Sequence, residues 1–274
     1  MSERADSAYR SAHFITSEMP HHYGPNVHIL GDPLALTQLA RLCQPATEQP
    51  LFNQLIGSLY LHLMRTVLNA EMPRRTERIA TRMSASTPRA VLETEFIDRT
   101  TRLVVVDIAR AGILPSQVCF DFCNTILDPS GVRCDHLIMS RTTNEAQQVS
   151  GALIAGGKIG GPIEDRIVLL PDPMGATGTS LVTAISHYKQ HNPGAARKWI
   201  TMNLIITPQF VQAMHAAHPE VIIYALRLDR GMSAPDVLSS ALGVHPERES
   251  GLNDHDYIVP GGGGFGELMN NAFV

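Results

Sequence analysis

Continuous apolar runs that alternate with amphipathic segments constrain the fold of this chain more than any other feature. Such runs predict strands at 102–108, 134–139, 166–170, 199–207 and 221–228. Apolar residues three and four apart predict helices between them, at 112–127, 180–192 and 208–219. Strands that lack polar alternation are typical of parallel sheets buried on both faces. We therefore predict an α/β fold: a mostly parallel, twisted sheet with helices on both faces.

The N-terminal part of the chain precedes this alternation. Residues 1–30 are polar and predict an irregular arm, so the main domain is expected over 31–274. Helical spacing predicts helices over 34–44 and 50–70. The basic, polar stretch 73–88 predicts a connector, or a helix followed by a turn.

Two further segments interrupt the pattern. Residues 142–164 are polar and rich in glycine, and residues 231–250 separate the last predicted strand from the C-terminal segment. We interpret 231–250 as an insertion and 142–164 as a hairpin or lid, with a disordered loop as the alternative.

The composition narrows the possible partners and location. Hydrophobic residues make up 44% of the chain and the net charge is −4, which indicates a globular protein without a nucleic-acid or acidic-membrane surface. No run approaches the roughly 20 apolar residues of a membrane span, and the first residues lack the apolar stretch of a signal peptide. We expect a cytoplasmic protein with free thiols at its four cysteines.

The segment "RIVLLPDPMGATGTS" (166–180) raises the question of a ligand. Its small residues follow a predicted strand and lead into a helix, where ligands of open α/β sheets bind. Amides from Ala176 to Ser180, with the Thr177 and Ser180 hydroxyls, would suit a phosphate. Asp172 would instead accept from sugar hydroxyls or bind a cation. The combination fits a phosphorylated ribose; the alternative is a plain β–α turn with a capping hydroxyl.

Four stretches resemble one family. "DPMGATGTS" (172–180) resembles the 5-phosphoribosyl diphosphate (PRPP) loop of type I phosphoribosyltransferases, in the form found in uracil phosphoribosyltransferases. "DIARAGILP" (107–115), "LIMSRTTNE" (137–145) and "GLNDHDYIVPGGGGFGE" (251–267) resemble further stretches of that family in the same order. The resemblance spans about 30–270. It implies a type I phosphoribosyltransferase fold with a helical N-terminal region.

The resemblance implies transfer of the 5-phosphoribosyl group from PRPP to uracil, which gives UMP and diphosphate. The catalytic residues it implies are Asp172, Arg110 and Arg141, although a lone surface arginine could equally form an ordinary ion pair. The PRPP site would comprise Arg110, Arg141, Asp172, Pro173, Met174, Gly175, Ala176, Thr177, Gly178, Thr179 and Ser180. The uracil site would comprise Tyr257, Ile258, Gly263, Gly264 and Phe265, unless that segment is a flexible glycine-rich tail.

The resemblance also implies partners. Mg²⁺ would arrive on PRPP, with no direct protein ligand. A homodimer or higher homo-oligomer is usual in the family, and some members respond to GTP.

The C-terminal segment departs from the family pattern. Gly264 and Phe265 stand where the family has Asp-Ala, and Glu267 replaces a second Asp. The carboxylate missing at Gly264 belongs to the PRPP and base site. Two alternatives therefore stay open: an enzyme acting on a different base, and a non-catalytic protein that binds PRPP or a nucleotide.

Overall fold

The computed structural model describes residues 9, 13–143 and 149–273. Its strands are β1 Val27–Ile29, β2 Arg74–Ala80, β3 Val91–Ile97, β4 Leu103–Ala109, β5 Val132–Thr143, β6 Val149–Lys158, β7 Ile167–Pro171, β8 Met174–Gly175, β9 Lys198–Ile206 and β10 Ile222–Leu228. Its helices are α1 Pro33–Leu42, α2 Leu51–Glu71, α3 Ile113–Ile126, α4 Thr179–His191, α5 Pro208–Ala217, α6 Pro235–Leu238 and α7 Phe265–Asn270, with 3₁₀ turns η1 Arg82–Ala85 and η2 Pro129–Gly131.

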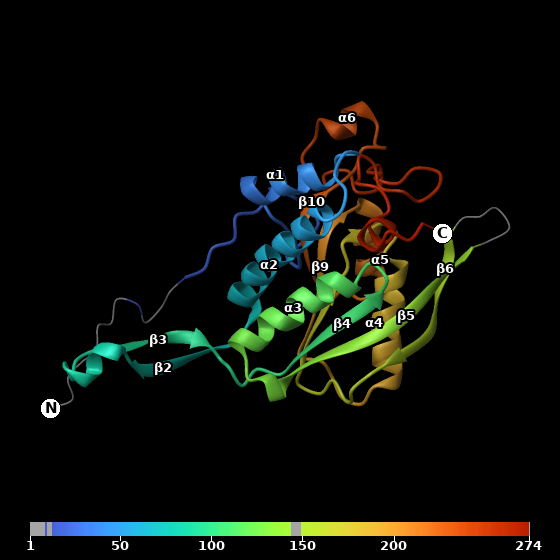
Figure 1. Ribbon diagram of the computed structural model, residues 1–274. Coiled ribbons are helices and arrows are strands. Elements are labelled where there is room, and N and C mark those ends of the chain that lie inside the picture. Colours follow the sequence, from blue (N-terminus) through green and yellow to red (C-terminus); the bar gives the residue numbers. More distant parts are fainter. Residues whose placement is uncertain (1–8, 10–12, 144–148, 274) are drawn as a thin grey trace.

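One large sheet organises the molecule (Figure 1). Within the described ranges its order is β1-β10-β9-β7-β4-β5-β6, and the short β8 also pairs with β9. Neighbouring strands run parallel from β1 to β5, and only the β5–β6 hairpin is antiparallel. The predicted mostly parallel α/β fold is confirmed.

Each face of this sheet packs on its own group of helices. In β4, Val105 faces a core that includes α1, α2 and α3, whereas Val104 and Val106 face α4 and α5. All three valines are fully buried. Burial on both faces explains why these strands lack polar alternation. None of the helices in the described ranges is long and apolar enough to cross a membrane.

The stretch 73–88 was predicted wrongly. Instead of a connector or a helix, β2 pairs with β3 as an antiparallel hairpin in the register Arg74↔Ile97, and η1 joins them. This hairpin extends away from the main sheet (Figure 1). All but one residue of β2 is exposed, so no apolar alternation marks it as a strand.

Strands also form in the N-terminal arm, which was predicted to be irregular, and in the glycine-rich segment, which was predicted to be a hairpin or lid. β1, at the end of the polar arm, pairs with β10 along Val27↔Ile223. β6 lies within the glycine-rich segment and pairs with β5. The middle of that segment, 144–148, lies outside the described residues.

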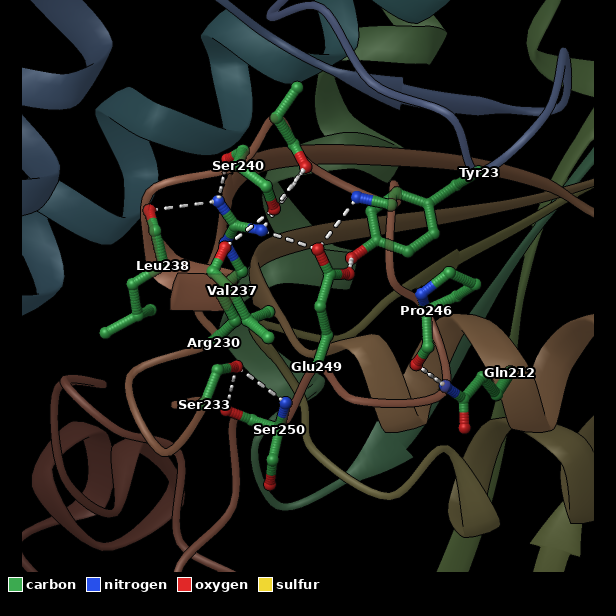
Figure 2. Close-up of polar contacts among 12 residues, drawn as sticks. Tyr23, Gln212, Arg230, Ser233, Val237, Leu238, Ser240, Pro246, Glu249 and Ser250 are labelled. Atoms are coloured by element: carbon green, nitrogen blue, oxygen red, sulfur yellow. Dashed lines mark hydrogen bonds and ion pairs between the residues drawn. The ribbon is translucent and has the colours of Figure 1, made fainter. Parts of the chain in front are cut away.

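A buried carboxylate fixes the segment 231–250 to the sheet (Figure 2). Glu249 accepts hydrogen bonds from the Tyr23 hydroxyl, from Arg230 Nη1 at 2.5 Å and from the Gly243 amide at 2.9 Å. Its side chain is fully buried, and that of Arg230 is only 10% exposed. Arg230 also donates to the Ser240 carbonyl at 2.6 Å. The Arg230–Glu249 ion pair therefore joins the end of β10 to the segment 231–250, and the Tyr23 hydroxyl adds the N-terminal segment.

We expect Glu249→Gln to lower the free energy of unfolding by about 3 kcal/mol, because it leaves the buried Arg230 cation without its counter-charge. Denaturant unfolding would measure the loss. Glu247→Gln, at an exposed position in the same segment, is the matched control. Equal stability of the two variants would contradict this account.

Candidate functional site

A cavity of about 550 Å³ opens at the carboxyl ends of the parallel strands. Three separate segments line it: the turn after β4, the loop between β7 and α4, and the C-terminal segment around 255–267. Met139 from β5 and Phe210 from α5 complete its wall. Parallel strands place these distant segments at one edge of the sheet, as expected for an open α/β fold.

The loop after β7 is held rigidly from outside. Thr207, at the end of β9, donates its hydroxyl to the Ala176 carbonyl at 2.6 Å and its amide to the Gly175 carbonyl at 3.1 Å. Gly178 has φ 81°, a left-handed conformation that turns the chain into α4. This loop is therefore pre-formed before any ligand binds.

Several amides of this loop are available as donors. Across the described part of the chain, the Thr177, Gly178 and Ser180 amides donate no hydrogen bond to a protein acceptor. The Ala176 amide, in contrast, donates to the Met174 carbonyl at 3.1 Å. Donors at the start of a helix suit an anion. Of the five amides predicted as donors, Ala176 and Thr179 already have an acceptor within the protein, the latter at 3.4 Å.

Arg110 reaches the cavity from a tight turn after β4. The Ala109–Arg110 peptide is cis. A Cβ at Gly112 would lie 2.8 Å from the backbone nitrogen and oxygen of Ile108, so only glycine fits there. The Arg110 guanidinium contacts Glu267 at 3.6 Å and donates to the Ala272 carbonyl at 3.2 Å.

The C-terminal segment is clamped at Gly261. The Asp229 carboxylate, at the end of β10, accepts from the Gly261 amide at 2.8 Å and from Arg227 at 2.6 and 2.8 Å. Arg227 also donates to the Gly261 carbonyl at 3.0 Å. Gly261 has φ 59°, which favours glycine. The peptide groups before and after Gly261 are therefore both held by hydrogen bonds.

Tyr60 lies behind the PRPP-type loop and stays neutral. It is fully buried and donates to the Met202 carbonyl at 3.1 Å. Burial, and then the nearby Asp172 carboxylate, raises the pKa of Tyr60 well above its usual value. Tyr60 therefore serves as a fixed donor and not as an acid or base near neutral pH.

The cavity brings together most of the predicted site residues. Pro173 does not line it; it is buried, and its carbonyl accepts from Leu204 and Ile205. Arg141 lies in β5, but its side chain is outside the described residues. The predicted residues that line the cavity are Arg110, Asp172, Met174, Gly175, Ala176, Thr177, Gly178, Thr179, Ser180, Tyr257, Ile258, Gly263, Gly264 and Phe265.

Sequence reasoning did not single out several residues of the site. His255, Asp256 and Glu267 line the cavity as well, and Asp229 supports it from behind. Asp229 directly follows an apolar strand, as Arg110 and Asp172 do, so the same positional rule could have found it. Asp256 lies in an irregular segment and Glu267 in the short helix α7, and neither position follows a predicted strand, so this rule could not have found them.

We expect Asp229→Asn to loosen the Gly261 clamp, because an amide has a single acceptor oxygen and cannot accept all three hydrogen bonds that the two carboxylate oxygens take from Arg227 and Gly261. Buried unpaired donors cost about 1–3 kcal/mol each. Hydrogen exchange should quicken at Gly261–Gly264, and the free energy of unfolding should fall by about 2 kcal/mol. Asp236→Asn, a largely exposed carboxylate, is the control. Unchanged exchange at Gly261–Gly264 would contradict the clamp.

Comparison with known proteins shows to which family this chain belongs. The family model for uracil phosphoribosyltransferase matches residues 29–248. Uracil phosphoribosyltransferases from Burkholderia vietnamiensis and Variovorax paradoxus are 30% and 27% identical over 89% of this chain, and the matches cover 94% and 97% of those proteins. The AQ2163 protein from Aquifex aeolicus shares the fold, with a TM-score of 0.68 and 19% identity over 90% of this chain and 99% of that one. The chain belongs to the uracil phosphoribosyltransferase family.

Proposed function

We propose that this protein transfers the 5-phosphoribosyl group of PRPP to uracil, giving UMP and diphosphate. One observation carries the proposal: a single cavity joins available loop amides, a guanidinium and a glycine-rich backbone segment. These are the three kinds of group needed for a phosphate, a diphosphate and a planar base.

The sugar-phosphate end would bind at the β7–α4 loop. The amides of Thr177, Gly178 and Ser180 would donate to the 5-phosphate, and the Thr177 hydroxyl would add a further donor. Thr177 Oγ1 lies 2.9 Å from Thr179 Oγ1, so both hydroxyls would lie on the same side of the 5-phosphate. Asp172 would accept from the ribose hydroxyls.

The diphosphate would bind Arg110, whose planar guanidinium can donate to two oxygens at once. We propose the same role for Arg141, from the resemblance alone. Uracil would be read by backbone groups of Ile258 and Gly263–Phe265, because its imide edge alternates acceptor, donor and acceptor. Tyr257 would lie beside the ring.

In the reaction, the bond from ribose C1′ to the diphosphate oxygen breaks and a bond from C1′ to uracil N1 forms. The N1 proton leaves to solvent, and positive charge develops on the ribose ring. Catalysis would come mainly from positioning and from stabilising the departing diphosphate. The predicted cover formed by the β5–β6 hairpin would limit hydrolysis by excluding water.

Magnesium would enter with PRPP. Among the described residues, no three His, Cys, Asp or Glu side chains gather as metal ligands. The ion would be held mainly by the diphosphate and water. When bound, the ion would neutralise diphosphate charge. A homo-oligomeric state, a response to GTP and a cytoplasmic location stay predictions from the sequence.

Two other functions stay open because the C-terminal segment differs from the family. The family match ends at 248, before that segment, and the cavity has carboxylates at Asp256 and Glu267. Acceptors of this kind favour a base with an amino group, so a related base is the second candidate. A protein that binds PRPP without turnover is the third.

The test is an assay with PRPP, Mg²⁺ and labelled uracil, run beside cytosine, other pyrimidines and purines. We expect UMP from uracil. Product from another base alone would favour the second candidate, whereas PRPP binding without product would favour the third.

We expect Asp172→Asn to lower kcat/KM for PRPP by about 10- to 100-fold, because a charged acceptor to sugar hydroxyls contributes about 1.5–3 kcal/mol. The KM for uracil should change little. Steady-state kinetics with each substrate varied would measure both, and Asp236→Asn is the control. A change confined to the uracil KM would contradict the assigned role.

A further inference from the structure

The Glu267 side chain occupies the space directly above Gly264. The three atoms nearest to a Cβ placed at Gly264 all belong to Glu267: Oε2, which would overlap it, Cδ at 3.1 Å and Cγ at 3.8 Å. Oε2 lies within the distance, about 2.4 Å, that separates Cβ from a carboxylate oxygen in an aspartate side chain. Glu267 thus holds a carboxylate oxygen no farther from the 264 Cβ position than an aspartate at 264 would hold its own.

The backbone at Gly264 does not itself demand glycine. Its φ of −83° and ψ of 92° are open to ordinary residues. The obstacle to a side chain is therefore Glu267 alone. Gly264 and Glu267 are complementary, because the absent side chain of Gly264 leaves a space that the Glu267 side chain fills.

This carboxylate faces Arg110 across the cavity. Glu267 Oε1 lies 3.6 Å from Arg110 Nη2, and both side chains are 38% exposed. Arg110 Nη1 donates to the carbonyl of Ala272, which follows the C-terminal end of α7. The guanidinium is thus held between two groups of the C-terminal segment.

The helix that carries Glu267 is firmly anchored. Phe265 is 1% exposed and packs edge-to-face on Phe52 of α2, with ring centroids 5.2 Å apart. Asn53 and Gln49 donate to the Met269 carbonyl at 3.1 and 3.3 Å. A carboxylate on such a support can orient a flexible guanidinium.

A local role would also bring Glu267 close to Gly264. Gly264 is the N-cap of α7, and a glutamate three residues later commonly turns back toward the N-cap. That capping role needs only a hydrogen-bond acceptor, which glutamine also supplies. The two roles therefore differ in whether the negative charge matters.

We propose that Glu267 is the positioning residue for Arg110, and that it supplies from α7 the carboxylate that Gly264 lacks. The proposal rests on the proposed function, since it assigns Arg110 to the diphosphate of PRPP. It also implies that a carboxylate at position 264 can take over this role. Gly264→Asp should orient Arg110 when Glu267→Ala removes the competing carboxylate.

The experiment measures the PRPP dissociation constant by calorimetry, with Mg²⁺, for the wild type, Glu267→Gln, Gly264→Asp and the double variant Gly264→Asp/Glu267→Ala. Glu267→Gln should weaken PRPP binding by about threefold, the size expected for a partly exposed ion pair. Gly264→Asp alone should weaken it more, because two carboxylates compete for one space. The double variant should return to within about twofold of the wild type. Glu247→Gln is the control, and thermal unfolding midpoints should stay alike.

Unchanged or tighter PRPP binding by Glu267→Gln would overturn the proposal, because the carboxylate would then only cap the helix or repel the diphosphate. A double variant no better than Gly264→Asp would overturn it as well. UMP formation is measured in a separate assay. If PRPP binding follows this pattern without UMP formation, only the proposed transfer to uracil fails; if the wild type does not bind PRPP, both fail.

Discussion

Parallel pairing of β4, β7 and β9 is the constraint on which the site depends. It brings the carboxyl ends of these strands together, so Arg110 and Asp172 reach the same cavity from segments about 60 residues apart. Thr207, at the end of β9, then fixes the β7–α4 loop through two hydrogen bonds. The sheet therefore sets both the place of the cavity and the shape of the β7–α4 loop that lines it.

The central sheet could be predicted from sequence because its strands are buried on both faces. Val104–Val106 and Val168–Leu170 form short apolar runs, which are typical of strands covered by helices on either side. The β2–β3 hairpin could not be predicted, because most of its side chains face solvent and their order carries no apolar period. β1 is only three residues long and is stabilised by β10, which lies almost 200 residues further on.

The PRPP-type loop and Arg110 were predictable because each directly follows an apolar strand. The C-terminal half of the site was predicted only in part. Its backbone is fixed by contacts distant in sequence, such as Asp229 with Gly261. The departure at Gly264 suggests a lost carboxylate from sequence alone, whereas the structure puts the Glu267 carboxylate in the same space. The sequence spacing alone cannot reveal that the Glu267 side chain turns back toward Gly264.

The most direct test of the central claim is a crystal structure with UMP bound. The account predicts the phosphate within hydrogen-bond distance of the Thr177, Gly178 and Ser180 amides, with the uracil ring beside Ile258. A phosphate bound elsewhere, or those amides turned toward protein acceptors, would contradict it.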